Sequence, residues 1–367
     1  MSHKLLSLLA MAVLVLTAAT AAVDDSDAAS SEDYMSQLSD SGKGLYTALD
    51  AEFTKLMEDP KDIASISYDI ETPVLFPMTD EGKEAAKGQA GAMVGDVLAA
   101  YYLTNPFPIW MWNYPVTDVS ADVAIEKVSV KVGGESTEWW AVTSVSFQLS
   151  VPEKYIDNPD TENNETADAM AAVEAKMTEV IGSVKDKVSA INDILRGVKS
   201  TDDEEGKISN IHDALVTGTS SSAGVAAAFT YLCKENGLTA QTVLGQVMKS
   251  TDGETATGYW NVVEDEGKWY GVDSTWNSSD ARNCLMAGST TKVSMSQDVS
   301  SRFGATHLAD IDMKTDNTLF APVLETVGVQ WPDDSTFLEK YGAQILMAIV
   351  GIVFVLAVIY AIRTGGV

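Results

Sequence analysis

The segment Gly258–Trp276, GYWNVVEDEGKWYGVDSTW, decides the fold because it predicts a β-hairpin with large aromatic side chains on both strands. Val, Tyr and Trp favour strands, whereas the sequence Asp265-Glu266-Gly267 between the two runs is typical of a turn. A three-residue turn at this point places Tyr259 opposite Asp273. Position 258, a glycine, is then expected to lie next to the Asp273 carboxylate.

A helix is predicted on the N-terminal side of this hairpin, in the segment Thr217–Phe229, TGTSSSAGVAAAF, and it continues to Asn236-Gly237. The N-terminus of a helix stabilises an anion, so enzymes often place a nucleophile at such a junction. This junction offers only the hydroxyls of Ser220, Ser221 and Ser222. We expect these serines to cap the helix by accepting hydrogen bonds from its free N–H groups.

The remaining periodic segments predict a mixed α+β chain. TAQTVLGQVM, residues 239–248, predicts a strand between the helix and the hairpin, and Ala169–Val198 predicts one long helix. Residues 157–168 are polar and contain a proline, which indicates a boundary between two domains. Before this boundary we expect two helices and two strands, at residues 34–58, 83–103, 123–132 and 137–151.

Composition excludes one class of partner. The 367 residues carry 53 acidic and 24 basic side chains, a net charge of −29, with no basic cluster that could neutralise phosphates. A nucleic-acid-binding protein needs such a cluster, so no nucleic acid is expected as a partner. The acidic excess is typical of a solvated surface.

The two ends of the chain predict an exported protein with a membrane anchor. A mildly basic start, an apolar run from Leu5 to Leu16 and small residues before position 22 follow the order of a signal peptide, although an uncleaved anchor is an alternative. Residues 343–362 contain no charged side chain over 20 positions, enough for a helix to cross a bilayer, and Arg363 follows. The prediction is a single-pass cell-membrane protein with its ectodomain outside the cytoplasm.

Four motifs resemble those of the transglutaminase-like superfamily, in its secreted microbial branch. They are KVSAINDIL at Lys187–Leu195, ALVTGTSSSAGVAAAF from Ala214, GYWNVV from Gly258 and GKWYGVDSTW from Gly267, in the order and spacing of that family. The resemblance implies a papain-like core in which a helix packs on an antiparallel sheet. Residues 1–22 would then be the signal peptide, 23–157 a smaller α+β domain, 158–320 the transglutaminase-like domain, 321–342 a juxtamembrane segment and 343–363 the transmembrane helix.

The resemblance also implies where a catalytic triad would lie. The family uses a Cys at the helix N-terminus, a His on the facing strand and an Asp on the next strand, which match Ser222, Gly258 and Asp273. Only the Asp is present, so we expect these to be vestigial positions. His212 and His307, the two histidines of the exported chain, lie outside the facing strand and are interpreted as surface or capping residues.

Neither of the two cysteines matches the nucleophile position. Cys233 lies 11 residues beyond Ser222 on the same predicted helix, and Cys284 lies in an apolar run, so both are expected to be buried thiols. The alternative, a disulfide between them, is open in an exported protein. So few histidines and cysteines give no reason to expect a metal site, and no motif indicates a cofactor.

The sequence therefore favours a non-catalytic binding or structural module, a pseudoenzyme, at the cell surface. Its partners would be the membrane through the C-terminal helix, and a surface protein, a peptide or a glycan. The alternative is an active acyltransferase or cysteine-protease-like hydrolase with an unrecognised nucleophile. Two sequons, at Asn164 and Asn277, are candidate glycosylation sites.

Overall fold

The computed structural model describes eleven segments of the chain, residues 33–58, 63–106, 121–132, 135–150, 165–176, 180–201, 209–248, 254–276, 284–296, 299–310 and 319–331. Residues up to Val329 belong to one compact unit, and a second unit begins at Gln330. The predicted domain boundary at 157–158, the signal peptide, the transmembrane segment and both sequons lie outside the described residues. Among the helices that are described, none has the length and apolar character needed to cross a membrane.

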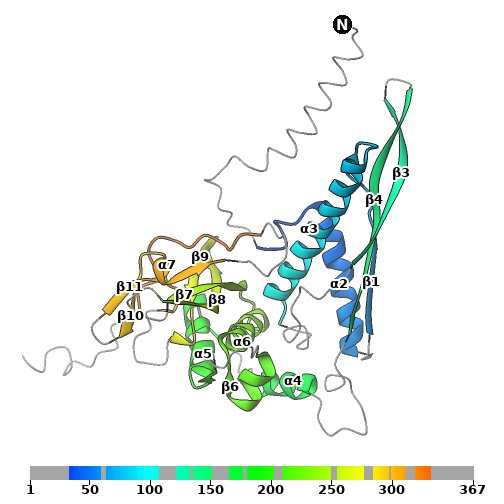
Figure 1. Cartoon of the computed structure of the whole chain (residues 1–367). Coiled ribbons are helices and arrows are strands. Elements are labelled where there is room, and N and C mark those ends of the chain that lie inside the picture. Colours follow the sequence, from blue (N-terminus) through cyan, green and yellow to red (C-terminus); the bar gives the residue numbers. More distant parts are fainter. Residues whose placement is uncertain are drawn as a thin grey trace, which may run out of the picture. The chain divides into compact units, whose positions relative to one another are not determined.

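The N-terminal half is an α+β arrangement, as predicted. Strand β4 (Glu135–Ser150) is central, with β3 (Ala121–Val132) along one side and β1 (Ile63–Asp69) and β2 (Leu75–Phe76) along the other, all antiparallel. Helices α2 (Asp40–Glu58) and α3 (Asp80–Thr104) pack together and against this sheet (Figure 1). Helix α2 begins six residues later than predicted because residues 34–37 form a turn.

The single long helix predicted for residues 169–198 is wrong. The structure has two helices, α4 (Glu165–Lys176) and α5 (Val184–Leu195). Gly182 has a φ of 154°, which a helix does not allow, and Ser183 starts α5 through a capping box with Asp186. Because the apolar spacing continues on both sides, the pattern alone did not reveal this break.

The C-terminal half holds the predicted helix on an antiparallel sheet. Helix α6 (Ser222–Glu235) packs on a sheet of order β12-β7-β8-β9, formed by β7 (Ala240–Met248), β8 (Thr255–Asp265), β9 (Lys268–Val272) and β12 (His307–Ala309) (Figure 1). A buried polar contact joins the two layers, since the Asn261 amide donates to the Ala226 carbonyl and to the Thr230 hydroxyl, both at 2.9 Å. The other sheet face covers an apolar cluster containing Trp260, Trp269 and Phe303.

The β8–β9 hairpin is confirmed, but its predicted register is wrong by one residue. Glu266 and Gly267 both have positive φ, 54° and 77°, which defines a two-residue type I′ turn rather than a three-residue one. Asp265 therefore pairs with Lys268, and Tyr259 does not lie opposite Asp273.

Several short elements were not predicted. Parallel strands β5 (Lys199–Ser200) and β6 (Thr219–Ser220) pair beside a π-helical turn, η4 (Asp213–Thr217). Beyond the hairpin, β10 (Lys292–Ser296) and β11 (Val299–Arg302) form a ribbon, followed by the four-residue helix α7 (Phe303–Thr306) and by β12. The segment Leu319–Val329, which we call the strap, runs beside β9 through hydrogen bonds such as Glu325 N–H to the Trp269 carbonyl at 2.8 Å.

Candidate functional site

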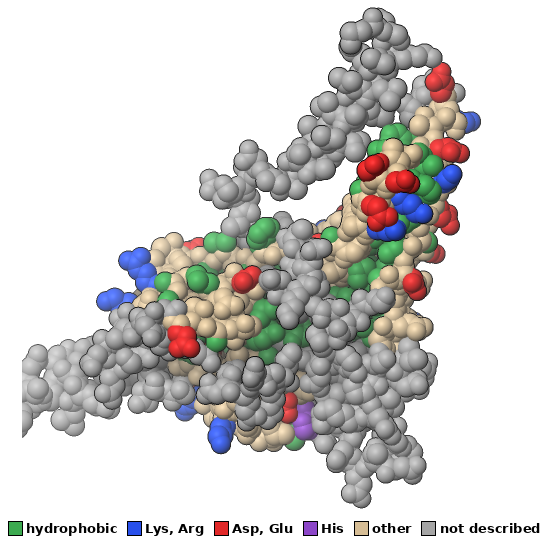
Figure 2. All heavy atoms as spheres, viewed as in Figure 1, with side chains coloured by type: hydrophobic (Ala, Val, Ile, Leu, Met, Phe, Trp, Pro, Cys, Tyr) green, Lys and Arg blue, Asp and Glu red, His purple; other side chains and the backbone are tan. Residues whose placement is uncertain are grey.

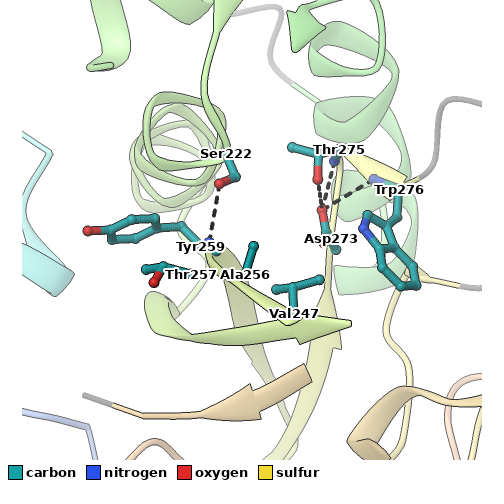
Figure 3. A pocket seen from close by; sticks show the side chains of 9 residues that line it. Ser222, Val247, Ala256, Thr257, Tyr259, Asp273, Thr275 and Trp276 are labelled. Atoms are coloured by element: carbon teal, nitrogen blue, oxygen red, sulfur yellow. Dashed lines mark hydrogen bonds between the residues drawn. The ribbon is translucent and has the colours of Figure 1, made fainter. Parts of the chain in front are cut away.

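The three triad positions line one small cavity of about 70 Å³ (Figure 3). Ser222 reaches it from the first residue of α6, Gly258 from β8 and Asp273 from the residue after β9. The other lining residues are Val247, Ala256, Thr257, Tyr259, Thr275 and Trp276. The structure thus brings together the positions that the motifs selected.

Helix capping by the serine side chains is not what the structure shows. Ser221 is the N-cap residue of α6, but its hydroxyl makes no capping hydrogen bond and instead accepts the Ser209 N–H at 3.2 Å. The Ser220 hydroxyl donates to the Ser221 carbonyl at 3.0 Å. The Ser222 hydroxyl accepts the Tyr259 N–H at 3.3 Å (Figure 3), so this serine links α6 to β8.

Gly258 has no room for a larger side chain. A Cβ atom placed on this glycine would lie 2.6 Å from Cγ2 of Val247, on the neighbouring strand β7. Real carbon atoms do not approach so closely, and a β-branched valine in a sheet has few alternative rotamers. An imidazole at position 258 therefore requires Val247 to move or to be replaced.

Asp273 is buried, and its two carboxylate oxygens have different partners. Oδ1 accepts from the N–H and hydroxyl groups of Thr275 and from the Trp276 N–H, which closes a tight turn after β9. Oδ2 lies 3.1 Å from Nε2 of His307. The carboxylate thus still contacts an imidazole, but the histidine comes from β12 instead of β8.

The interpretation of His307 as a surface or capping residue is wrong. Its side chain has no exposed surface, its ring stacks on Phe303 at 4.0 Å between centroids, and the edges of Trp260 and Trp276 face it at 5.3 and 4.9 Å. Its Nδ1 lies 2.8 Å from the Thr306 hydroxyl, so both ring nitrogens have partners. Sequence reasoning missed it because β12 is three residues long and reaches Asp273 only through the tertiary fold. The other histidine, His212, is half-buried beside η4 and distant in sequence from the hairpin.

A hydroxyl, an imidazole and a carboxylate lie in a row here, as in a catalytic triad, and they belong to Thr306, His307 and Asp273. All three are buried, and neither Thr306 nor His307 lines the cavity. The Thr306 hydroxyl also lies 3.0 Å from the Phe303 carbonyl, to which it donates. These three groups link the end of β9 to β12, the two outer strands of the sheet.

Both cysteines are buried, as predicted, and the structure holds them as free thiols. Burial raises the pKa of the Cys233 thiol well above its usual value. Burial, followed by the charge of the nearby Asp273, does the same to the pKa of Cys284. A cysteine nucleophile needs a lowered pKa, so neither thiol has the required environment. The described residues contain no group of three or more His, Cys, Asp or Glu side chains that could hold a metal ion.

The family comparison agrees with the motifs. Residues 171–274 match the family model of the transglutaminase-like superfamily. This segment is a transglutaminase-like domain. It begins in α4, contains all of α6, β7, β8 and β9, and ends one residue after Asp273, so His307 lies beyond the matched part.

Three solved structures are similar to the chain, each with 14% sequence identity. The alignment with a protein described as a TGase covers 68% of this chain and 57% of that protein's chain, at a TM-score of 0.27. A putative cysteine protease from Cytophaga hutchinsonii aligns over 46% and 66%, and a putative protease from Parabacteroides distasonis over 58% and 43%, both at a TM-score of 0.25. This chain covers less than two thirds of each of those proteins. A comparison with curated proteins gave no match.

Proposed function

We propose that this protein is a membrane-anchored, extracytoplasmic protein whose transglutaminase-like domain is a non-catalytic, mainly structural module at the cell surface. One observation carries the proposal. The histidine that contacts Asp273 is His307, which is buried, bonded at both ring nitrogens and absent from the cavity that Ser222 lines.

Acyl transfer through a side-chain nucleophile requires a base within hydrogen-bond reach of that nucleophile. The Ser222 hydroxyl accepts the Tyr259 N–H. Among the residues that line the cavity, the one carboxylate is Asp273, whose oxygens accept bonds from Thr275, Trp276 and His307. A serine in this environment stays protonated and is a poor nucleophile.

The size of the cavity favours a structural role over a ligand-binding cleft. Pockets that hold small ligands usually measure about 300–1,000 Å³. The cavity beside Ser222 measures about 70 Å³, enough for a few water molecules. A surface protein, peptide or glycan is therefore expected to contact a different part of the ectodomain.

The membrane and export parts of the proposal rest on sequence. The signal-like start and the uncharged run at 343–362 both lie outside the described residues. Protease added to intact cells should remove the ectodomain and leave a fragment containing Arg363. Full protection of the described segments in intact cells would reject this orientation.

Catalysis is tested with the purified protein, which should show no transamidation, peptidase or amidase turnover above a blank. The alternative, an active enzyme, needs a nucleophile, and the candidates are Ser222 and the thiol nearest Asp273, Cys284. Turnover that disappears in Ser222→Ala or Cys284→Ala would establish the enzyme and reject the pseudoenzyme. Val216→Ala, at an exposed position outside the cavity, is the matched control.

A further inference from the structure

The β10–β11 ribbon places two cations directly opposite each other. Lys292 pairs with Arg302 in the antiparallel register, and both side chains are exposed. Neither side chain forms an ion pair within the residues that the structure describes. Like charges in a direct cross-strand pair are destabilising unless an anion lies between or above them.

This pair is unusual for the composition of the chain. With 53 acidic and 24 basic residues, a basic side chain is far more often near an acid than near another base. Two exposed lysines on the helices do lie beside acids, Lys55 with Glu52 at 3.2 Å and Lys87 with Glu84 at 2.7 Å. Among the described residues, no acid forms an ion pair with Lys292 or Arg302, which makes the pair a candidate contact for an anion.

The strap is bonded to the residues just before Lys292 and carries exposed apolar side chains. Ser289 and Thr290, just before Lys292, donate their N–H groups to the strap carbonyls of residues 325 and 326 at 2.7 and 3.1 Å. The apolar strap residues with large exposed fractions are Phe320 (72%), Val323 (51%) and Val327 (62%). Figure 2 shows basic side chains over β10 and β11 with hydrophobic side chains beside them.

We infer that Lys292 and Arg302, together with Phe320, Val323 and Val327, form a surface that docks on an anionic lipid membrane. The two cations would contact headgroup phosphates while the apolar side chains enter the boundary between headgroups and acyl chains. We call these five residues the lipid surface. This inference rests on the membrane anchoring in the proposed function.

The length of the chain supports lipid as the occupant. Thirteen residues separate Val329, the end of the strap, from Ala343, the start of the uncharged run. Fully extended, they span at most about 50 Å, so an anchor at 343–362 would tether the strap to a bilayer through a short segment. The acid within the strap, Glu325, lies 3.9 Å from Lys268, which offsets its repulsion from anionic lipid. The acidic β8–β9 turn adjoins Lys268.

The test uses the full chain carrying Val327→Cys, labelled with a polarity-sensitive fluorophore. Cys233 and Cys284 are buried, so the label reports on position 327. The protein is reconstituted in vesicles of phosphatidylcholine alone or mixed with phosphatidylglycerol. We expect a blue shift in the mixed vesicles that high salt reverses. Each cation near an anionic surface contributes about fivefold to binding, so Lys292→Gln with Arg302→Gln should weaken docking by about 30-fold.

The matched control is Lys55→Gln with Lys87→Gln, which removes the same charge from α2 and α3 and should leave the shift unchanged. An equal loss in this control would show that net charge alone is responsible and would overturn the inference. A shift produced by inorganic phosphate without vesicles would identify a free-phosphate site and would also overturn it.

Failure of the anchoring is separable from failure of the docking. Flotation that resists alkaline carbonate in both kinds of vesicle reports on the anchor, because it does not depend on lipid charge. Protein that floats without a shift overturns the docking alone. Protein that does not float overturns the anchoring. In that case, mixed vesicles added to the protein test the docking: a blue shift supports it, and the absence of a shift rejects it.

Discussion

The contact between His307 and Asp273 should hold the two outer strands of the sheet together, and replacing His307 with alanine tests this. The change leaves the Asp273 carboxylate buried and without its Nε2 partner, which lies 3.1 Å away. Removing one member of a buried hydrogen-bonded pair costs about 3–5 kcal/mol of the free energy of unfolding. With an m-value of about 3 kcal/mol/M, the urea midpoint should fall by about 1–2 M.

Tryptophan fluorescence is a suitable assay because Trp260 and Trp276 both face the His307 ring. His212→Ala is the matched control, since His212 is half-buried and its Nδ1 has no hydrogen-bond partner in the part of the chain that the structure describes. This control should change the free energy of unfolding by no more than about 1 kcal/mol. Equal small effects from the two alanine variants would refute a stabilising role for His307.

A double-mutant cycle isolates the pair itself. Asp273→Ala also removes the acceptor of the Thr275 and Trp276 N–H groups, so it should cost at least as much as His307→Ala. The double variant should cost less than the sum of the two single variants by about 1–3 kcal/mol. Asp273→Asn keeps an oxygen for the turn and should be milder than Asp273→Ala. Simple additivity would show that the two side chains act separately.

Two further predictions follow from the cavity and from the thiols. The double variant Ser222→Cys with Gly258→His should not have a reactive thiol. Adding Val247→Ala should speed alkylation of that thiol at pH 6, because it removes the methyl group 2.6 Å from the new Cβ. Equal alkylation rates with and without Val247→Ala would contradict this prediction. The native protein should resist labelling by iodoacetamide at pH 8, because the raised pKa values of Cys233 and Cys284 leave little thiolate at that pH. Unfolding in urea should restore labelling of both cysteines. Rapid labelling of the folded protein would show that a thiol is accessible.

The sequence predicted the parts of the fold that depend on local pattern. Strand β7, helix α6 and the β8–β9 hairpin follow from strand-forming runs, small apolar residues and turn residues within short windows. The motifs also placed Ser222, Gly258 and Asp273 around one cavity. What the local pattern could not give was the turn register, because Glu266 adopts a positive φ that its residue type does not favour.

The remaining misses concern contacts between distant segments. His307 reaches Asp273 across 34 residues, and its strand β12 is too short to show alternation. The backbone of the strap hydrogen-bonds to Trp269, Ser289 and Thr290, and a sequence without periodicity does not reveal such contacts. The break at Gly182 was missed for a local reason, because a helical pattern continues on both sides of it.

An aspartate at the third triad position does not by itself indicate catalysis in this domain. In this chain Asp273 closes the turn after β9 through Oδ1 and holds β12 through Oδ2, and both tasks are independent of residues 222 and 258. The side of the cavity where a catalytic histidine would stand is occupied by Val247. Two substitutions would restore the residue types of the triad, but a third, at position 247, is needed to restore the space. A histidine at position 258 therefore needs space that the Val247 side chain fills in this structure.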